Sequence, residues 1–119
     1  VLINPVKSGL DYIHSSMRRF WEKEFENSEE NLAYWTKQIS KIPTIGVGSV
    51  GLDSDFIDMT APASPTSIER AIEDISKNKY DMIAVGRALL SDPEWVLKMK
   101  EGRLNDVIPY TKEALLNLY

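Results

Sequence analysis

The sequence predicts an α/β fold with a parallel sheet. Three short apolar segments alternate with amphipathic segments, in the order strand, helix, strand, helix, strand, helix, helix. Alternation of this kind is typical of right-handed βαβ units. The chain has 119 residues, of which 43% are hydrophobic and 27% charged. This composition suits a single ordered domain rather than a disordered segment.

The first strand and the first helix are predicted in the first third of the chain. An apolar and aromatic run at 11–15 indicates a buried strand, and a long polar connection follows it. Ser28 is expected to cap the helix, with Glu29 and Glu30 at the positive end of its dipole. The apolar stripe expected on this helix consists of Leu32, Trp35 and Ile39.

The second strand is predicted at 44–48, where it leads into the glycine-rich stretch 48–51. Residues 52–64 show no clear period and are expected to cross the surface. Thr66 and Glu69 form the capping box of the next helix. Its apolar positions are Ile68, Ala71, Ile72 and Ile75.

The third strand is predicted at 81–85, which is apolar almost throughout, as are strands covered on both faces by helices. It ends before Gly86, and a short helical turn is expected at 89–90. Asp92 and Pro93 then introduce a helix over 95–100, which stops at Gly102, and an amphipathic stretch at 111–118 closes the chain.

The spacing of the strand ends suits a β/α barrel. The ends at His14, Gly48 and Gly86 lie 34 and 38 residues apart, close to the roughly 31 residues per unit of an eight-fold barrel. A doubly wound sheet would give the same alternation, so the period alone does not decide. Because residues 1–8 look like the end of an element, we interpret residues 1–119 as an incomplete segment. Its open sheet edges should pair with a missing half or with another copy.

The composition excludes several classes of function. A net charge of −4 without a long Lys/Arg run argues against a nucleic-acid partner. No apolar run approaches the length of about 20 residues that spans a bilayer, so a cytoplasmic protein without a membrane partner is expected. With no cysteine and one histidine, the chain is not expected to hold a metal through thiolates or a histidine cluster.

Glycines end two consecutive predicted strands. Gly48, Ser49 and Gly51 follow the second strand, and Gly86 and Arg87 follow the third. Such loops let backbone N–H groups approach an anion, and in barrels a phosphate commonly lies between the last two strands. The pair of loops therefore predicts a phosphate site to which Arg87 adds positive charge, although each loop alone is better explained as a simple turn.

Four stretches carry a resemblance to a known family. They are Asp11 to Ser15, Arg18 to Glu22, Pro43 to Gly51 and Ala84 to Trp95. Together they resemble the C-terminal part of the old yellow enzyme family, the NADH:flavin oxidoreductases, and especially its bacterial branch. Lys23 departs from this pattern, because proline is expected there in the close bacterial relatives.

The resemblance implies that the chain contains strands 6 to 8 of a TIM barrel that binds FMN. It implies that Gly48, Ser49, Gly51, Gly86 and Arg87 hold the flavin phosphate. It further implies hydride transfer from NADH or NADPH through FMN to an activated alkene, a small-molecule substrate. The family's catalytic residues belong to earlier strands, so none is assigned here.

Other residues are open to two interpretations. Phe20 and Trp21 could form a lid over substrate or simply pack on a neighbouring element. His14 is better explained as a structural histidine. Arg18 and Arg19 could attract the phosphates of the nicotinamide cofactor, although adjacent charges usually form a solvated face. The carboxylates expected to be solvated in the surface segment are Asp53, Asp55 and Asp58.

Two alternatives to the flavin enzyme remain at this stage. One is a phosphate-binding barrel lyase or isomerase without flavin, and the other is a non-catalytic assembly module. The flavin hypothesis also predicts that the chain alone has little or no turnover, because three strands cannot close a barrel.

Overall fold

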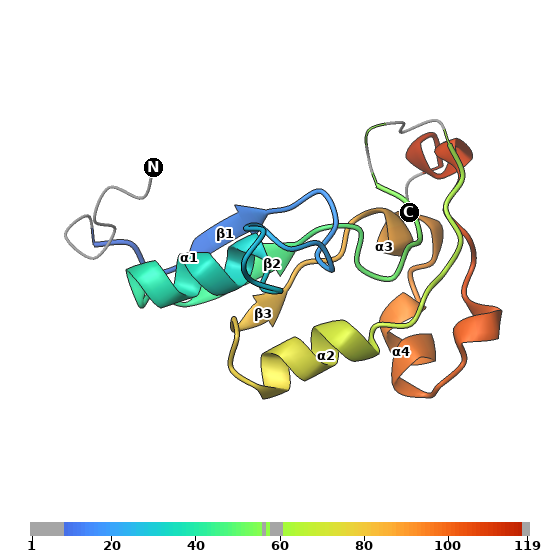
Figure 1. Cartoon of the computed structure of the whole chain (residues 1–119). Helices are drawn as coiled ribbons and strands as arrows, with labels where there is room; N and C mark the ends of the chain where they lie inside the picture. Colours follow the sequence, from blue (N-terminus) through green and yellow to red (C-terminus); the bar gives the residue numbers. More distant parts are fainter. Residues whose placement is uncertain (1–8, 56, 58–60, 118–119) are drawn as a thin grey trace.

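The computed structural model describes residues 9–55, 57 and 61–117 (Figure 1). Its sheet contains β1 (Ile13–Ser16), β2 (Thr44–Val47) and β3 (Met82–Ile83), which pair in parallel in the order β1-β2-β3. The predicted α/β fold with a parallel sheet is therefore confirmed. The closed barrel stays a prediction, and residues 1–8 lie outside the described part of the chain.

The helices follow the predicted order. The α-helices are α1 (Leu32–Ser40), α2 (Glu69–Ser76), α3 (Arg87–Ser91) and α4 (Trp95–Lys100). Two 3-10 turns follow, η1 (Leu104–Asp106) and η2 (Lys112–Leu115), so only a short turn forms within the stretch predicted at 111–118. Gly102 has a φ of +72° just after α4, which confirms the predicted stop.

Helix α1 is capped by Asn31, so the prediction of Ser28 was wrong. The Asn31 side chain accepts a hydrogen bond from the Tyr34 N–H at 3.0 Å and donates one to the Phe20 carbonyl at 2.9 Å. Ser28 instead accepts from the Glu30 N–H, one turn too early. The amide of Asn31 thus caps the helix with its oxygen and holds the preceding loop with its nitrogen.

The face that α1 turns toward the sheet is made of small residues. Ala33, Thr36 and Ser40 are buried, whereas Ile39 is 64% exposed, so the predicted apolar stripe was wrong at that position. A Cβ on Gly46 would lie 3.1 Å from the Ala33 Cβ, which shows how closely the helix approaches β2. Small side chains are what this contact requires.

Helix α2 begins at Glu69, which rules out the predicted capping box. The Glu69 N–H donates to the Ser67 hydroxyl at 3.2 Å. Ile72 is 55% exposed, and the buried positions of the helix are Ala71 and Asp74. Asp74 is buried because it accepts a hydrogen bond from the Tyr80 hydroxyl at 3.1 Å, a contact with no signal in the helix itself.

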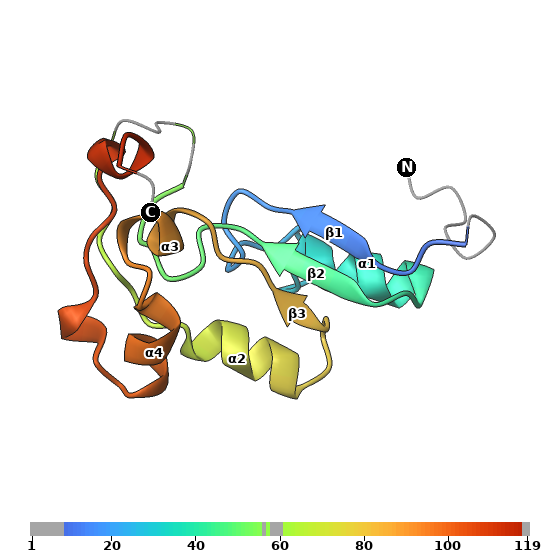
Figure 2. The ribbon, with the colours of Figure 1, turned by 180° about the vertical axis from the view of Figure 1, so that it is seen from behind.

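Strand β3 is shorter and less buried than predicted, since it includes only Met82–Ile83 and Met82 is 48% exposed. Helix α1 contacts one face of the sheet at β1 and β2. In Figure 2 the other face points toward the viewer, and no helix of the described chain covers it. The expectation of helices on both faces was therefore wrong for the described residues, and His14 and Ser16 on this face are exposed.

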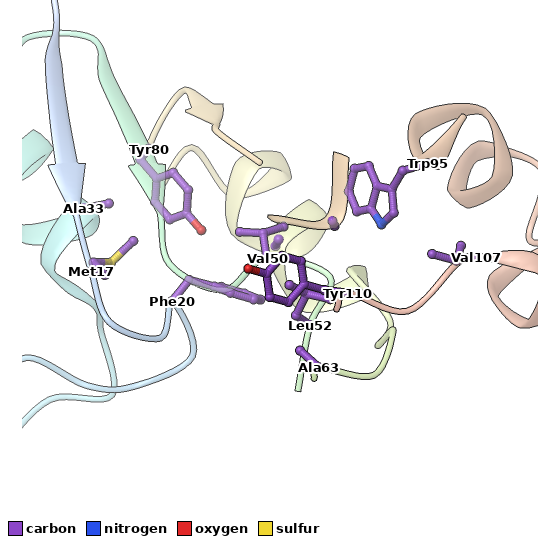
Figure 3. Packing of buried hydrophobic residues seen from close by; sticks show 12 residues of the cluster. Met17, Phe20, Ala33, Val50, Leu52, Ala63, Tyr80, Trp95, Val107 and Tyr110 are labelled. Atoms are coloured by element: carbon purple, nitrogen blue, oxygen red, sulfur yellow. The ribbon is translucent and has the colours of Figure 1, made fainter. Parts of the chain in front are cut away.

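Much of the hydrophobic core lies beyond the carboxyl ends of the strands (Figure 3). Phe20, Val50, Leu52 and Tyr110 belong to one hydrophobic cluster. Ala63 and Tyr110 exchange two backbone hydrogen bonds of 2.9 Å. Both ends of the segment expected to cross the surface are thus fixed in the core, with Leu52 and Ala63 each 2% exposed.

Candidate functional site

A cleft of about 320 Å³ lies at the carboxyl end of the sheet. It is lined by Ser16, Met17, Val47, Gly48, Ser49, Val50, Gly86 and Arg87. The lining includes four of the five residues predicted for the phosphate site. They belong to two different loops, in which Ser49 and Arg87 are 38 residues apart in the sequence. This is the edge of a parallel sheet where α/β proteins bind ligands.

Arg87 begins α3 and is only 9% exposed. Its Nη1 donates to the Asp55 carbonyl at 3.0 Å, and its Nη2 donates to the Ser54 carbonyl at 2.6 Å and to the Ser49 hydroxyl at 3.3 Å. The guanidinium carbon lies 5.3 Å from the centroid of the Tyr110 ring. All of these partners are neutral.

The charge of Arg87 is therefore not balanced by a carboxylate of the described residues, whose ion pairs do not include it. A guanidinium stays protonated in a protein, and removing it from water without a counter-ion is unfavourable. An anion that enters the cleft would supply that counter-ion. The local electrostatics thus favour a negatively charged ligand at this wall.

The structure explains the three glycines predicted for the site in different ways. A Cβ on Gly48 would lie 2.9 Å from the Met17 carbonyl oxygen, so the loop after β1 packs directly on it. Gly51 does not line the cleft; its φ is +78° and a Cβ there would lie 2.8 Å from Trp95. A Cβ on Gly86 would meet no atom within 4 Å. Packing explains the first two glycines, while Gly86 leaves open space in the cleft.

Ser49 joins the loops that follow the three strands. Its hydroxyl donates to the Arg18 carbonyl at 3.0 Å and accepts from Arg87 Nη2 at 3.3 Å. Its own backbone has a φ of +53°, the left-handed conformation that turns the chain after β2. None of the N–H groups of Ser49, Val50 and Gly86 donates to another described residue. The cleft thus has backbone donors beside its buried cation.

Asp55 is an ion-paired residue, so the expectation that it is solvated was wrong. Its side chain is 10% exposed, and its Oδ2 lies 2.6 Å from Arg18 Nε and 2.7 Å from Arg19 Nη2. The hydrogen bond from Arg18, followed by that from the Ile57 N–H, lowers the pKa of Asp55 below its usual value. The sequence does not predict this cluster, because Arg18 and Asp55 are 37 residues apart in the chain.

The neighbouring carboxylates behave differently. Asp53 is exposed, and its Oδ1 accepts a hydrogen bond from the Ser64 N–H at 2.8 Å. Asp58 lies outside the described residues. The ion pairs of Asp55 are therefore not shared by Asp53.

The aromatic pair expected as a substrate lid packs into the protein. Phe20 is 5% exposed and belongs to the hydrophobic cluster, so its ring packs inside the protein. Trp21 contacts it edge-on, with ring centroids 5.4 Å apart, and is partly buried against the same cluster. Packing on a neighbouring element, the second interpretation of the pair, accounts for both.

The described residues contain no group of three or more His, Asp or Glu side chains arranged to hold a metal ion. They also contain no helix with the length and apolar character needed to cross a membrane.

The fold and the cleft define an α/β protein with an anion-favouring site at the ends of parallel strands. No family model matches the chain. The chain is similar to an NADH oxidase of Thermoanaerobacter brockii, with 35% identity over 74 residues. The match covers 62% of this chain and 10% of that relative, so the chain spans about a tenth of the relative's length. This similarity supports a relationship to NADH oxidoreductases.

Proposed function

We propose that this chain is the C-terminal portion of an FMN-dependent NAD(P)H oxidoreductase of the old yellow enzyme type. In this proposal the loops after β2 and β3 bind the flavin phosphate. When bound, FMN would supply the redox chemistry that carries a hydride from NADH or NADPH to an activated alkene. The part assigned to this chain is to bind and orient the phosphate.

The observation that carries the proposal is the buried guanidinium of Arg87. It lines the cleft, and its partners among the described residues are two carbonyls, a hydroxyl and an aromatic ring. Arginine is well suited to such a site because its planar fork matches phosphate oxygens. A phosphomonoester would provide the missing negative charge.

The rest of the cleft fits a phosphate group. Gly86 leaves room beside Arg87, and the Ser49 hydroxyl lies within hydrogen-bonding distance of the guanidinium. The N–H groups of Ser49, Val50 and Gly86 add donors of the kind that bind phosphate in barrel loops. Gly51 supports this arrangement from outside the cleft by allowing the loop to pack on Trp95.

The similarity to an NADH oxidase supports an oxidoreductase as the parent activity. The old yellow enzyme type, the flavin and the alkene substrate are the finer parts of the proposal, and they rest on the sequence motifs. We expect the 119-residue chain alone to bind the phosphate end of FMN while showing little or no turnover.

The proposal is tested by comparing FMN with riboflavin, which has the same ring system but no phosphate. Titration of each ligand is followed by isothermal calorimetry. FMN should bind at least about tenfold more tightly, since a charge-assisted hydrogen bond contributes roughly 1.5 to 3 kcal/mol. Arg87→Gln should reduce this preference by a similar factor.

The matched control is Arg70→Gln, which removes the same charge from an exposed position on α2 outside the cleft. It should leave the preference for FMN unchanged. Equal binding of FMN and riboflavin by the original chain would refute the phosphate assignment. Binding of sugar phosphates with no preference for FMN would instead favour the phosphate-binding lyase or isomerase.

A further inference from the structure

A second group of cations lies next to the cleft. Arg18 and Arg19, in the loop after β1, both direct a guanidinium nitrogen at Oδ2 of Asp55, at 2.6 and 2.7 Å. The two arginine side chains are 50% and 32% exposed, whereas the Asp55 side chain is 10% exposed. A carboxylate is therefore enclosed by two guanidinium groups that solvent can still reach.

These arginines also line a hollow of their own, with a volume of about 160 Å³. It is lined by Ser16, Met17, Arg18, Arg19, Glu22, Lys23, Glu24 and Leu32. Ser16 and Met17 also line the Arg87 cleft, so the two hollows share one wall. The charged lining residues are three cations and two carboxylates, and Asp55, which pairs with Arg18 and Arg19, adds a third carboxylate.

Two carboxylates pair with the two arginines, and of these only Asp55 contacts both. Asp55 carries one negative charge against two guanidinium groups, and the second carboxylate on Arg19 is the exposed Glu22, at 2.5 Å. A diphosphate group carries more charge than a carboxylate and offers several acceptor oxygens that match paired arginines. It could therefore compete with Asp55 for these two side chains.

We propose that Arg18 and Arg19 form a subsite for a diphosphate group and that Asp55 occupies it as an internal carboxylate, which the ligand displaces. The diphosphate of a dinucleotide and free pyrophosphate share this chemistry. The assignment to NADH or NADPH rests on the proposed function, whereas the subsite itself rests on the contacts of Asp55. Because the Asp55 carbonyl also accepts from Arg87, displacement would change one contact in the neighbouring cleft.

The test uses Asp55→Asn, which keeps the size of the side chain and removes its charge. Inorganic pyrophosphate is titrated by calorimetry, and the variant should bind it about fivefold more tightly, as expected when competition from partly exposed ion pairs is removed. The matched control is Asp53→Asn, which removes the same charge two residues away, where no arginine is paired. It should change the affinity by less than about twofold.

Further variants separate this proposal from the phosphate assignment. The gain in Asp55→Asn should disappear when Arg18 and Arg19 are both changed to Gln, and it should persist in an Arg87→Gln background. Equal gains in the Asp53 and Asp55 variants, or no gain at Asp55, would overturn the subsite. Circular dichroism establishes that each variant keeps its secondary structure.

The last arm of the experiment identifies the source of the diphosphate. NADH and adenosine monophosphate are titrated against the chain and against Asp55→Asn. A gain with NADH and pyrophosphate but none with the monophosphate supports a diphosphate ester as the ligand. A gain of the same size with adenosine monophosphate would refute selectivity for diphosphate, while leaving the FMN test at Arg87 unaffected.

Discussion

Replacing Gly51 by alanine should destabilise the protein through packing and not through ligand binding. The residue has a φ of +78°, and an added Cβ would lie 2.8 Å from Cζ2 and 3.0 Å from Nε1 of Trp95. Both Gly51 and Trp95 are buried, and the indole is 4% exposed. The ring therefore has little room to move away from a new methyl group.

The expected cost is the sum of two contributions. The left-handed conformation costs an alanine about 1 to 2 kcal/mol. Forcing a methyl group into a packed contact costs about 1 to 3 kcal/mol. The free energy of unfolding should therefore fall by about 2 to 5 kcal/mol, a large part of the total for a domain of this size.

The assay is urea unfolding followed by tryptophan fluorescence. With a urea dependence of about 1 to 3 kcal/mol per molar, the midpoint should fall by at least about 0.7 M. Gly86→Ala is the matched control because its Cβ would meet no atom within 4 Å. It should change stability by less than about 1 kcal/mol but weaken FMN binding, since the methyl group enters the cleft. A loss below about 0.5 kcal/mol for Gly51→Ala would refute the packing argument.

Three further outcomes follow from buried polar contacts. Lys98→Ala should lower the free energy of unfolding in urea by about 3 to 5 kcal/mol, because Asp92, which is 1% exposed, loses its ion pair at 2.8 Å. An unchanged urea midpoint would contradict this. Burial alone raises the pKa of Asp92, but hydrogen bonds from Lys98 and the Ile108 N–H lower it overall. The stability that Asp92 contributes should thus be fully present above the usual aspartate pKa and be lost as the pH falls through the lowered pKa of Asp92 in the folded protein. Asp92→Asn should therefore flatten the pH dependence of the urea midpoint. Tyr80→Phe should cost about 1 kcal/mol in the same assay through loss of its hydrogen bond to Asp74, and a stabilised variant would contradict that contact.

The parts of the fold that the sequence predicts are those determined by local patterns. Strand and helix order follow from apolar periodicity, and the predicted ends of the strands at Gly48 and Gly86 lie in the cleft lining. The cap of α1 was predicted at Ser28, whereas the structure has Asn31 in that role. What selects Asn31 is the carbonyl of Phe20, 11 residues earlier, and no helical pattern contains that information.

The candidate site likewise combines features that local sequence patterns predict with contacts between distant residues that they do not. Glycine after a strand predicts a loop that can approach an anion, but it does not tell which glycine has a packing role. Gly51 packs on Trp95, which lies on α4, and Asp55 pairs with arginines from the loop after β1. These contacts depend on how distant loops meet, so only the folded structure reveals them.

The way the loops meet has a consequence for binding. Ser49 links the Arg18 carbonyl to the Arg87 guanidinium, and Asp55 links Arg18 and Arg19 by its carboxylate and Arg87 by its carbonyl. A cleft held in this way needs little further ordering when a ligand enters, which reduces the entropic cost of binding. It also connects the two proposed sites through one residue, because a ligand that moves Asp55 changes the hydrogen bonding of Arg87. Pyrophosphate should therefore alter the affinity for FMN in the original chain, and this effect should be lost in Asp55→Gly, where the carboxylate is absent and the loop is less constrained.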